Sequence, residues 1–421
     1  MRNQRKLKQS VISVLLVTLL IPGLALAKGS GKNRGLSPEA MQELRDAGMD
    51  KYLGEFTPSS SEDIGDGWTK YTFDTADGDG PICIDGSPYS VFTRNSKGKS
   101  NEKRPNELLI MLQGGGACWK GVTECTQFVA GQEPPFERAG IWDFDNKDNP
   151  FDKHAVVYLP YCDGSVFVGD NTVEDPDFDS ALGEDGERKH RGLRNLSAGL
   201  DVARATFGKP AKITVAGTSA GGVGAANFTP FLVRLLYGNK LQSLTVFNDA
   251  GPLAYNPAAP AAAEARANDW LFAQFYPASC SACSPLLNQT GLVQWRLDND
   301  STIREAVYQT DADGTNTFFS SLNVPGIPPI APNFPFGLTQ NEFRDLTLDA
   351  HAPINDSHPK RYKRFIVSGD PSHTALQFPR FYDQDANGVL LNEWTADFLK
   401  NRKGWIDIVE DFVAAPTATA P

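Results

Sequence analysis

The chain has 421 residues, of which 40% are hydrophobic and 22% are charged, and its formal net charge is -11 at pH 7. This length suits one large α/β domain with insertions, or two domains. The acidic balance argues against nucleic acid and anionic membrane surfaces as partners, because like charges repel at long range.

The first 27 residues have the three regions of a secretory signal peptide in order. They begin with four basic residues, continue through the apolar stretch 11–20 and end in Ala25-Leu26-Ala27 before Lys28. Cleavage there removes four positive and no negative charges, which leaves a formal charge of -15. No other run approaches the roughly 18 apolar residues of a spanning helix. We therefore expect a secreted or periplasmic protein without stable membrane insertion.

Residues 28–60 are polar apart from a helical pattern around 38–53, and we interpret them as an N-terminal lead-in. Beyond them, strand-like and helix-like segments alternate. The expected strands are 107–112, 155–159, 212–216, 243–248 and 364–368, and helical patterns cover 192–207, 225–236 and 381–399. This alternation predicts a mostly parallel central sheet with helices on both faces.

One catalytic domain is expected over residues 61–412. Its segment 255–336 is rich in Ala, Pro and Asn, which suggests inserted loops and helices over the sheet. The low-complexity end, 413–421, is expected to be disordered.

A nucleophile elbow is predicted at Gly217-Thr-Ser-Ala-Gly221, between the expected strand 212–216 and a helical pattern. Such a turn exposes its serine beside the amides of the helix N-terminus, and the glycines relieve crowding in the turn. A glycine-rich strand-to-helix junction also occurs in phosphate sites, so the motif depends on its partners. Ser219 is the candidate nucleophile.

His373 best fits the base that the serine needs. It follows the expected strand 364–368 late in the chain, where the order Ser, acid, His of α/β-hydrolases places it. The other histidines are interpreted as packing, surface or loop residues: His154, His190, His351 and His358. The chain order admits three orienting acids: Asp249, Asp313 and Asp370.

An oxyanion hole is predicted from a second glycine-rich loop, Gln113-Gly-Gly-Gly-Ala117, which follows the expected strand 107–112. In α/β-hydrolases one donor is the amide after the nucleophile, here Ala220, and another comes from such a loop. Each donor is worth about 3 kcal/mol of transition-state stabilisation.

Six cysteines in an exported chain indicate up to three disulfides. Cys118 and Cys125 are close enough in sequence to close a small loop, and Cys280 and Cys283 a smaller one. Metal binding by Cys280-Ser-Ala-Cys283 is disfavoured, because no second Cys or His pair accompanies it. The segment 383–388 matches the first half of a calcium loop but has Trp394 where the chelating glutamate belongs, which favours a simple turn.

Several segments together resemble the pectin acetylesterase family, which includes Notum-type carboxylesterases. They are Cys83–Ser87, Leu112–Cys118, Tyr161–Ser165, Arg191-Gly192, Gly217–Gly222, Asp249–Gly251 and Gly369–His373. The resemblance implies an α/β-hydrolase fold, no metal or other cofactor, and ester hydrolysis by Ser219, His373 and an aspartate.

The resemblance also selects among the open alternatives. The family has its acid in a Tyr-x-x-x-x-Asp segment before a Phe-rich helix, which matches Tyr308 to Asp313, although Asn316 replaces a usual glutamine. The implied oxyanion donors are Gly115, Gly116 and Ala220. The implied disulfides are Cys83 with Cys162, Cys118 with Cys125 and, by remainder, Cys280 with Cys283.

The oxyanion loop departs from the family at Ala117, where the family has an aromatic residue; here Trp119 lies on the other side of Cys118. The wall of the acyl pocket is therefore expected to be built differently.

We expect a secreted, monomeric serine carboxylesterase that removes acetyl groups from a polysaccharide such as pectin. The acidic charge favours a neutral or methyl-esterified polymer over anionic polygalacturonate. Two alternatives stay open. One is a lipase-like or Notum-like deacylase of longer acyl esters, and the other is a carbohydrate-binding protein that keeps the fold without activity.

Overall fold

The computed structural model describes residues 35–74, 78–96, 105–119, 134, 138–175, 186–254, 260–286, 288–321 and 338–415. The expected signal peptide lies outside these ranges, as do residues 416–421 of the expected tail. Residues 33–421 group into one compact unit. Within the described ranges, no helix combines the length and apolar character needed to cross a membrane.

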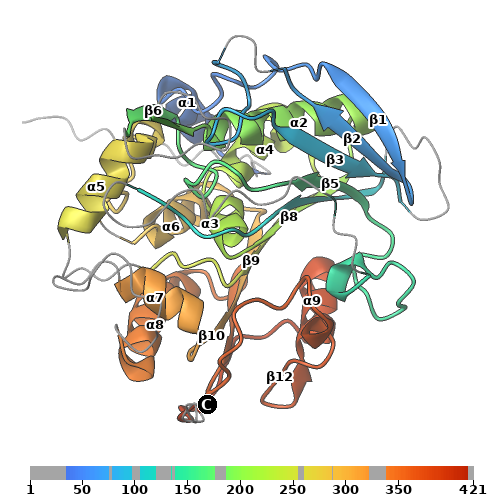
Figure 1. Ribbon diagram of the computed structural model, residues 1–421. Coiled ribbons are helices and arrows are strands. Elements are labelled where there is room, and N and C mark those ends of the chain that lie inside the picture. Colours follow the sequence, from blue (N-terminus) through green and yellow to red (C-terminus); the bar gives the residue numbers. More distant parts are fainter. Residues whose placement is uncertain are drawn as a thin grey trace, which may run out of the picture. The chain divides into compact units, whose positions relative to one another are not determined.

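A ten-stranded sheet runs through this unit (Figure 1). The strand order is β1-β2-β3-β5-β4-β8-β9-β10-β11-β14. Neighbours from β5 to β14 are parallel, and β1 to β3 form an antiparallel edge that joins β5. The strands are β1 Ser60–Gly65, β2 Trp68–Thr72, β3 Ser90–Arg94, β4 Glu107–Leu112, β5 Ala155–Leu159, β8 Lys212–Thr218, β9 Ser243–Asp249, β10 Arg304–Thr310, β11 Tyr362–Val367 and β14 Ile408–Val409. The expected mostly parallel α/β architecture is confirmed.

The two faces of the sheet bury separate apolar clusters, because alternate residues of a strand point to opposite faces. Leu108 and Ile110 of β4 belong to one cluster, and Leu109 and Met111 to the other. The helices are α1 Pro38–Asp46, α2 Gly192–Phe207, α3 Ala220–Ala226, α4 Thr229–Tyr237, α5 Pro260–Trp270, α6 Thr290–Asn299, α7 Gly314–Ser321, α8 Gln340–Ser357 and α9 Leu391–Lys400. Buried residues of α1, α2, α4 and α6 pack in the first cluster, and those of α9 in the second.

Segment 255–336 differs from its prediction as an insertion over the sheet, because it contains the central strand β10. This strand pairs with β9 on one side and β11 on the other. The polar residues of β10 are the reason that the sequence did not predict a buried strand here. Glu305 is buried and paired with Arg296 at 2.7 Å, and Gln309 is buried and donates to Asp313.

Segment 381–399 is also less continuous than its helical pattern suggested. The short helix η5 (Pro379–Phe381) and the hairpin of β12 (Asp385–Ala386) and β13 (Val389–Leu390) precede α9. Asn387 and Gly388 have positive φ at the hairpin turn, and the Gly388 amide donates to Asp385 Oδ1. The half-matched calcium motif is therefore part of a β-hairpin.

Candidate active site

Ser219 occupies a strained turn between β8 and α3. Its φ is 52° and its ψ is -120°, a left-handed conformation that non-glycine residues rarely adopt. A Cβ on Gly217 would collide with the Gly221 carbonyl, and one on Gly221 would collide with the Leu112 carbonyl. Both glycines of the motif are thus needed for the close approach, which the sequence motif predicted.

His373 and Asp313 come together from the ends of neighbouring strands. The His373 Nδ1 atom lies 2.7 Å from Asp313 Oδ2, and Asp313 is fully buried. Because a carboxylate accepts hydrogen bonds, we assign the ring proton to Nδ1, which leaves a lone pair on Nε2. That Nε2 atom is buried and has no hydrogen-bond partner among the described residues. The imidazole is therefore arranged to accept a proton at Nε2.

Asp313 is itself fixed by two donors. Gln309 Nε2 lies 3.0 Å from its Oδ2, and the Asn316 amide lies 2.9 Å from its Oδ1. The Asn316 side chain in turn donates to Gln309 Oε1 at 2.8 Å and to the Ala250 carbonyl at 2.8 Å. Asn316, which stands at the usual glutamine position, thus stiffens the support of the acid.

The two other candidate acids do not contact the imidazole. Asp370 Oδ1 accepts from the Ser372 amide at 2.8 Å, within the turn before His373. Asp249 accepts from the amides of Ala375 and Leu376, which follow His373 in the chain. Asp313 is the acid that the geometry places against the ring.

The remaining histidines have other surroundings. Burial lowers the pKa of His154 to about 4, and burial together with Arg188 lowers that of His190 to about 3. His351 is buried with Nδ1 at 2.6 Å from Tyr362 Oη, and burial lowers its pKa to about 3. His358 contacts Asp298 at 2.9 Å. Within the described ranges, no group of three His, Cys, Asp or Glu side chains could hold a metal ion.

The glycine-rich loop after β4 lies against the nucleophile turn. A Cβ on Gly114 would come within 3.1 Å of Ser219 Cβ. Gly116 has a φ of 79°, and no described acceptor bonds the amide of Gly115 or Gly116. As the first residue of α3, Ala220 has no intrahelical acceptor for its amide. These amides, the expected oxyanion donors, are thus left for a ligand.

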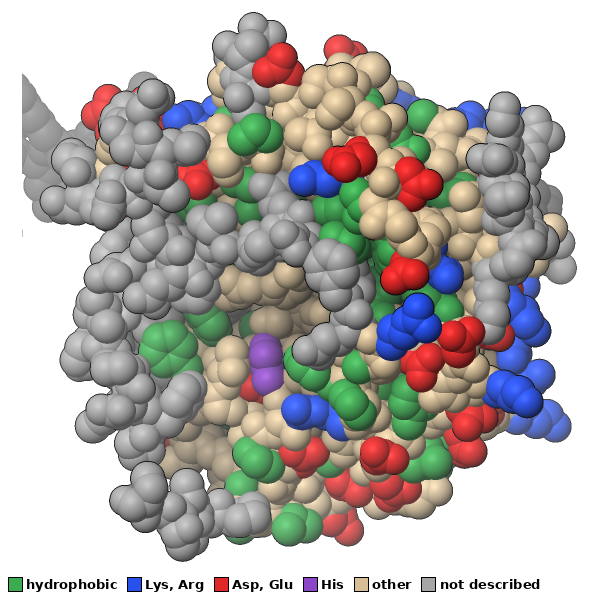
Figure 2. Space-filling view, turned by 45° about the vertical axis from the view of Figure 1, so that its right-hand side comes forward, with side chains coloured by type: hydrophobic (Ala, Val, Ile, Leu, Met, Phe, Trp, Pro, Cys, Tyr) green, Lys and Arg blue, Asp and Glu red, His purple; other side chains and the backbone are tan. Residues whose placement is uncertain are grey.

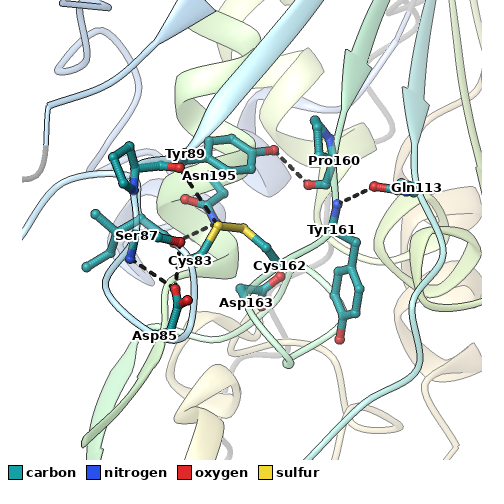
Figure 3. The surroundings of a disulfide bond; sticks show 12 residues. Cys83, Asp85, Ser87, Tyr89, Gln113, Pro160, Tyr161, Cys162, Asp163 and Asn195 are labelled. Carbon is teal, nitrogen blue, oxygen red and sulfur yellow. Dashed lines mark hydrogen bonds between the residues drawn. A yellow bond between two sulfur atoms is a disulfide. The ribbon is translucent and has the colours of Figure 1, made fainter. Parts of the chain in front are cut away.

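A disulfide lies next to Tyr161, a residue that contacts the first residue of this loop, Gln113 (Figure 3). Cys83 is joined to Cys162, and the preceding residue, Tyr161, donates its amide to Gln113 Oε1 at 3.0 Å. The Tyr161 ring also fills the space where Gly115 would carry a Cβ. The implied pairs Cys83–Cys162 and Cys280–Cys283 are both present. Cys118 is disulfide-bonded as well, but Cys125 lies outside the described residues.

A small cavity of about 40 Å³ opens beside the nucleophile. Its lining includes Gly116, Ala117, Trp119, Val166, Ser219, Ala220, Val223, Pro252, Arg266, Trp270, Asn316 and Phe319. Trp119 meets Trp270 of α5 edge to face, with ring centroids 5.8 Å apart. The wall beside Ala117 is therefore built by this tryptophan pair. Figure 2 shows a face of the molecule with a hollow in which a histidine side chain is visible.

Two contributors to the site were missed by sequence reasoning. Gln309 lies in the unrecognised strand β10, and its polar side chain in a buried strand was the one signal available. Trp270 ends a helix in a segment interpreted as an insertion, so nothing in the sequence tied it to Trp119.

Comparison with known proteins agrees with this geometry. Residues 68–266 match the family model described as Pectinacetylesterase, which confirms the resemblance. Among solved structures, the Wnt deacylase Notum from Drosophila aligns with a TM-score of 0.55 and 17% identity, covering 82% of this chain and 97% of that chain. This second likeness is one of fold. No curated protein matches the chain.

Proposed function

We propose that this chain, a member of the pectinacetylesterase family and a carboxylic ester hydrolase, removes acetyl groups from a polysaccharide by a Ser-His-Asp mechanism. One observation carries the proposal. The ring of His373 is held by Asp313 at 2.7 Å, while its other nitrogen is buried and unbonded among the described residues. This is the state of a general base that awaits the proton of a serine hydroxyl.

In the proposed mechanism, His373 Nε2 takes the proton of Ser219 Oγ as that oxygen attacks the ester carbonyl. The amides of Gly115, Gly116 and Ala220 bind the negative oxygen of the tetrahedral intermediate. His373 then protonates the departing alcohol, and an acyl-enzyme remains on Ser219. In the second half of the reaction, His373 takes a proton from a water molecule that attacks the acyl-enzyme, and then returns that proton to Ser219 Oγ. The carboxylic acid and the free serine are released.

Asp313 acts by holding the imidazole and stabilising its positive charge in the transition state. Its burial strengthens this interaction, because there is little solvent to screen it. The contacts from Gln309 and Asn316 keep the carboxylate from turning away.

The size of the cavity favours a short acyl group. A volume of about 40 Å³ accommodates a few atoms, such as the methyl of an acetyl group, between the tryptophan pair and Phe319.

The alcohol side is proposed to be an acetylated polysaccharide, such as pectin, outside the cell. Export rests on the signal-peptide pattern of residues 1–27 and on the disulfides, which form in oxidising compartments. The charge of the exported chain favours a neutral or methyl-esterified polymer.

The test combines one substitution with a series of substrates. Ser219→Ala is expected to abolish hydrolysis of p-nitrophenyl acetate and acetate release from acetylated polysaccharides. Ser197→Ala is the matched control, since Ser197 is a buried serine whose hydroxyl donates, among the described residues, to Leu193 O of its own helix. Full activity of Ser219→Ala would overturn the mechanism and favour the non-catalytic alternative. Equal or better turnover of the octanoate ester would overturn the acetyl preference.

A further inference from the structure

We propose that Asp249 is a positioning residue of this site, which fixes the histidine loop relative to the nucleophile turn. The inference rests on the proposed roles of Ser219 and His373. It assigns to Asp249 a task different from that of Asp313, because Asp249 holds main-chain groups on both sides of the reaction centre.

The main chain of Asp249 holds the nucleophile. Asp249 ends β9, where it lies beside Thr218 of β8 and Tyr308 of β10. Its carbonyl oxygen accepts the Ser219 amide at 2.8 Å. The next residue, Ala250, has a φ of 52° and donates its amide to the Tyr308 carbonyl at 2.9 Å. The backbone at Asp249 and Ala250 is therefore hydrogen-bonded to Ser219, directly after β8, and to β10.

The side chain of Asp249 holds the histidine loop. Its two carboxyl oxygens lie 3.1 and 3.0 Å from the Ala375 amide, and Oδ2 lies 2.7 Å from the Leu376 amide. Ala375 comes two residues after His373, and both Ala375 and Leu376 are buried. A single residue thus accepts hydrogen bonds both from the backbone of the proposed nucleophile and from the loop that carries the proposed base.

This placement has a catalytic consequence. A shift of about 1 Å in a reacting group costs on the order of 100-fold in rate. If the carboxyl group stops accepting the two amides, the loop that carries His373 loses its anchor to the strand that carries Ser219. Substrate binding in the cavity changes little, because Asp249 does not line it.

The charge of the Asp249 carboxyl group affects the same hydrogen bonds to Ala375 and Leu376. The titratable groups that face it are Tyr308 of β10, Asp313 beyond that strand and His373 of the loop. Burial raises its pKa to about 7, against the opposing effects of the Leu376 and Ala375 amides and of His373. The carboxyl group is therefore neutral below about pH 7 and ionised above it. Protonation places a hydrogen on an oxygen that already faces an amide donor, which weakens the anchor.

The experiment compares Asp249→Asn with Asp300→Asn in the full-length exported enzyme. Asp300 is an equally buried acid that accepts from Arg234 at 2.6 Å and from the amides of Thr302 and Ile303, and it has no contact with the loop of His373 among the described residues. With p-nitrophenyl acetate, Asp249→Asn should lower kcat about 100-fold with little change in KM. It should also remove the protonation step near pH 7 that we expect in the pH profile of the wild type. Asp300→Asn should lose stability and keep the wild-type pH profile.

Each outcome decides the inference. A wild-type kcat and pH profile for Asp249→Asn, with Ser219→Ala inactive, would overturn the role of Asp249 and leave the proposed function intact. Activity in Ser219→Ala would overturn both. If Asp249→Asn does not fold, the wild type still decides: its acidic limb should require two protonations, and a one-proton limb contradicts the inference.

Discussion

Three carboxylates contact His373 or the residues next to it in the chain, and their contacts distinguish their roles. Asp313 touches the imidazole, Asp249 holds the loop after it, and Asp370 closes the turn before it. Orientation of the ring thus depends on one side chain and placement of the loop on another. Substitutions at these three positions should therefore affect different kinetic properties and lower kcat by different amounts.

Asp313→Asn should lower kcat by about 10⁴-fold with little effect on KM, because an asparagine favours the wrong tautomer of the imidazole. Steady-state kinetics on p-nitrophenyl acetate measure both constants. Asp370→Asn is the control, since its contact is a single amide of a turn. A larger loss of kcat for Asp370→Asn than for Asp313→Asn would contradict the assignment of the acid.

At this scale, local motifs placed the nucleophile turn and the glycine loop, because both depend on glycines at close backbone contacts. The acid could not be chosen from the residues alone, since three aspartates satisfy the chain order. What separates them is the parallel register of β9, β10 and β11, which brings Asp313 to the ring. The sequence alone does not show this register, so the prediction of Asp313 depended on the family pattern Tyr-x-x-x-x-Asp.

Strand β10 shows why element prediction failed in the middle of the chain. Its sequence has two polar residues at each end around the apolar centre Ala306 to Tyr308, too short an apolar run to predict a buried strand, yet nearly all of it is buried. The polar positions are compensated by buried partners on other elements, such as Arg296 of α6 for Glu305, and the sequence pattern does not show these pairings. A strand made almost wholly of apolar residues, like β5 with its Ala, Val, Tyr and Leu, needs no such partners and was recognised from its composition.

The two described disulfides should differ in their effect on stability. Cys83–Cys162 spans 79 residues and Cys280–Cys283 spans 3, and the entropy removed from the unfolded chain grows with loop length. Replacing both cysteines by alanine should reduce the free energy of unfolding by ~4–5 kcal/mol for the first pair and ~2 kcal/mol for the second. Urea denaturation of the oxidised proteins measures both.

The first pair should also affect catalysis, because Cys162 adjoins Tyr161, which contacts Gln113 and Gly115 of the loop proposed to bind the oxyanion. The double variant of Cys83 and Cys162 is expected to lose kcat even where it remains folded. The double variant of Cys280 and Cys283 serves as the matched control and should keep it. The reverse order, in stability or in kcat, would contradict this account.

For the whole molecule, the site is assembled from segments far apart in sequence that meet at one edge of the parallel sheet. The glycine loop follows β4, the serine follows β8, the acid follows β10 and the histidine follows β11. Because the carboxyl ends of parallel strands meet at the same edge, this convergence follows from the fold class. The fold class was predictable from the alternation of strands and helices. The antiparallel edge of β1 to β3 was not, since β1 is polar and exposed.

The net charge of the molecule should affect kcat/KM differently for anionic and neutral polymers. Removal of residues 1–27, as proposed for export, leaves a formal charge of -15, so that an anionic polymer is repelled and a neutral one is not. Raising the ionic strength from 0.01 to 0.15 M shortens the screening length from about 30 Å to about 8 Å. We expect kcat/KM for acetylated polygalacturonate to rise several-fold over this range. The value for an acetylated neutral polysaccharide should stay constant, as should that for p-nitrophenyl acetate, the control for salt effects on the chemistry. A fall for the anionic polymer would show that a local cationic surface at the site outweighs the charge of the whole.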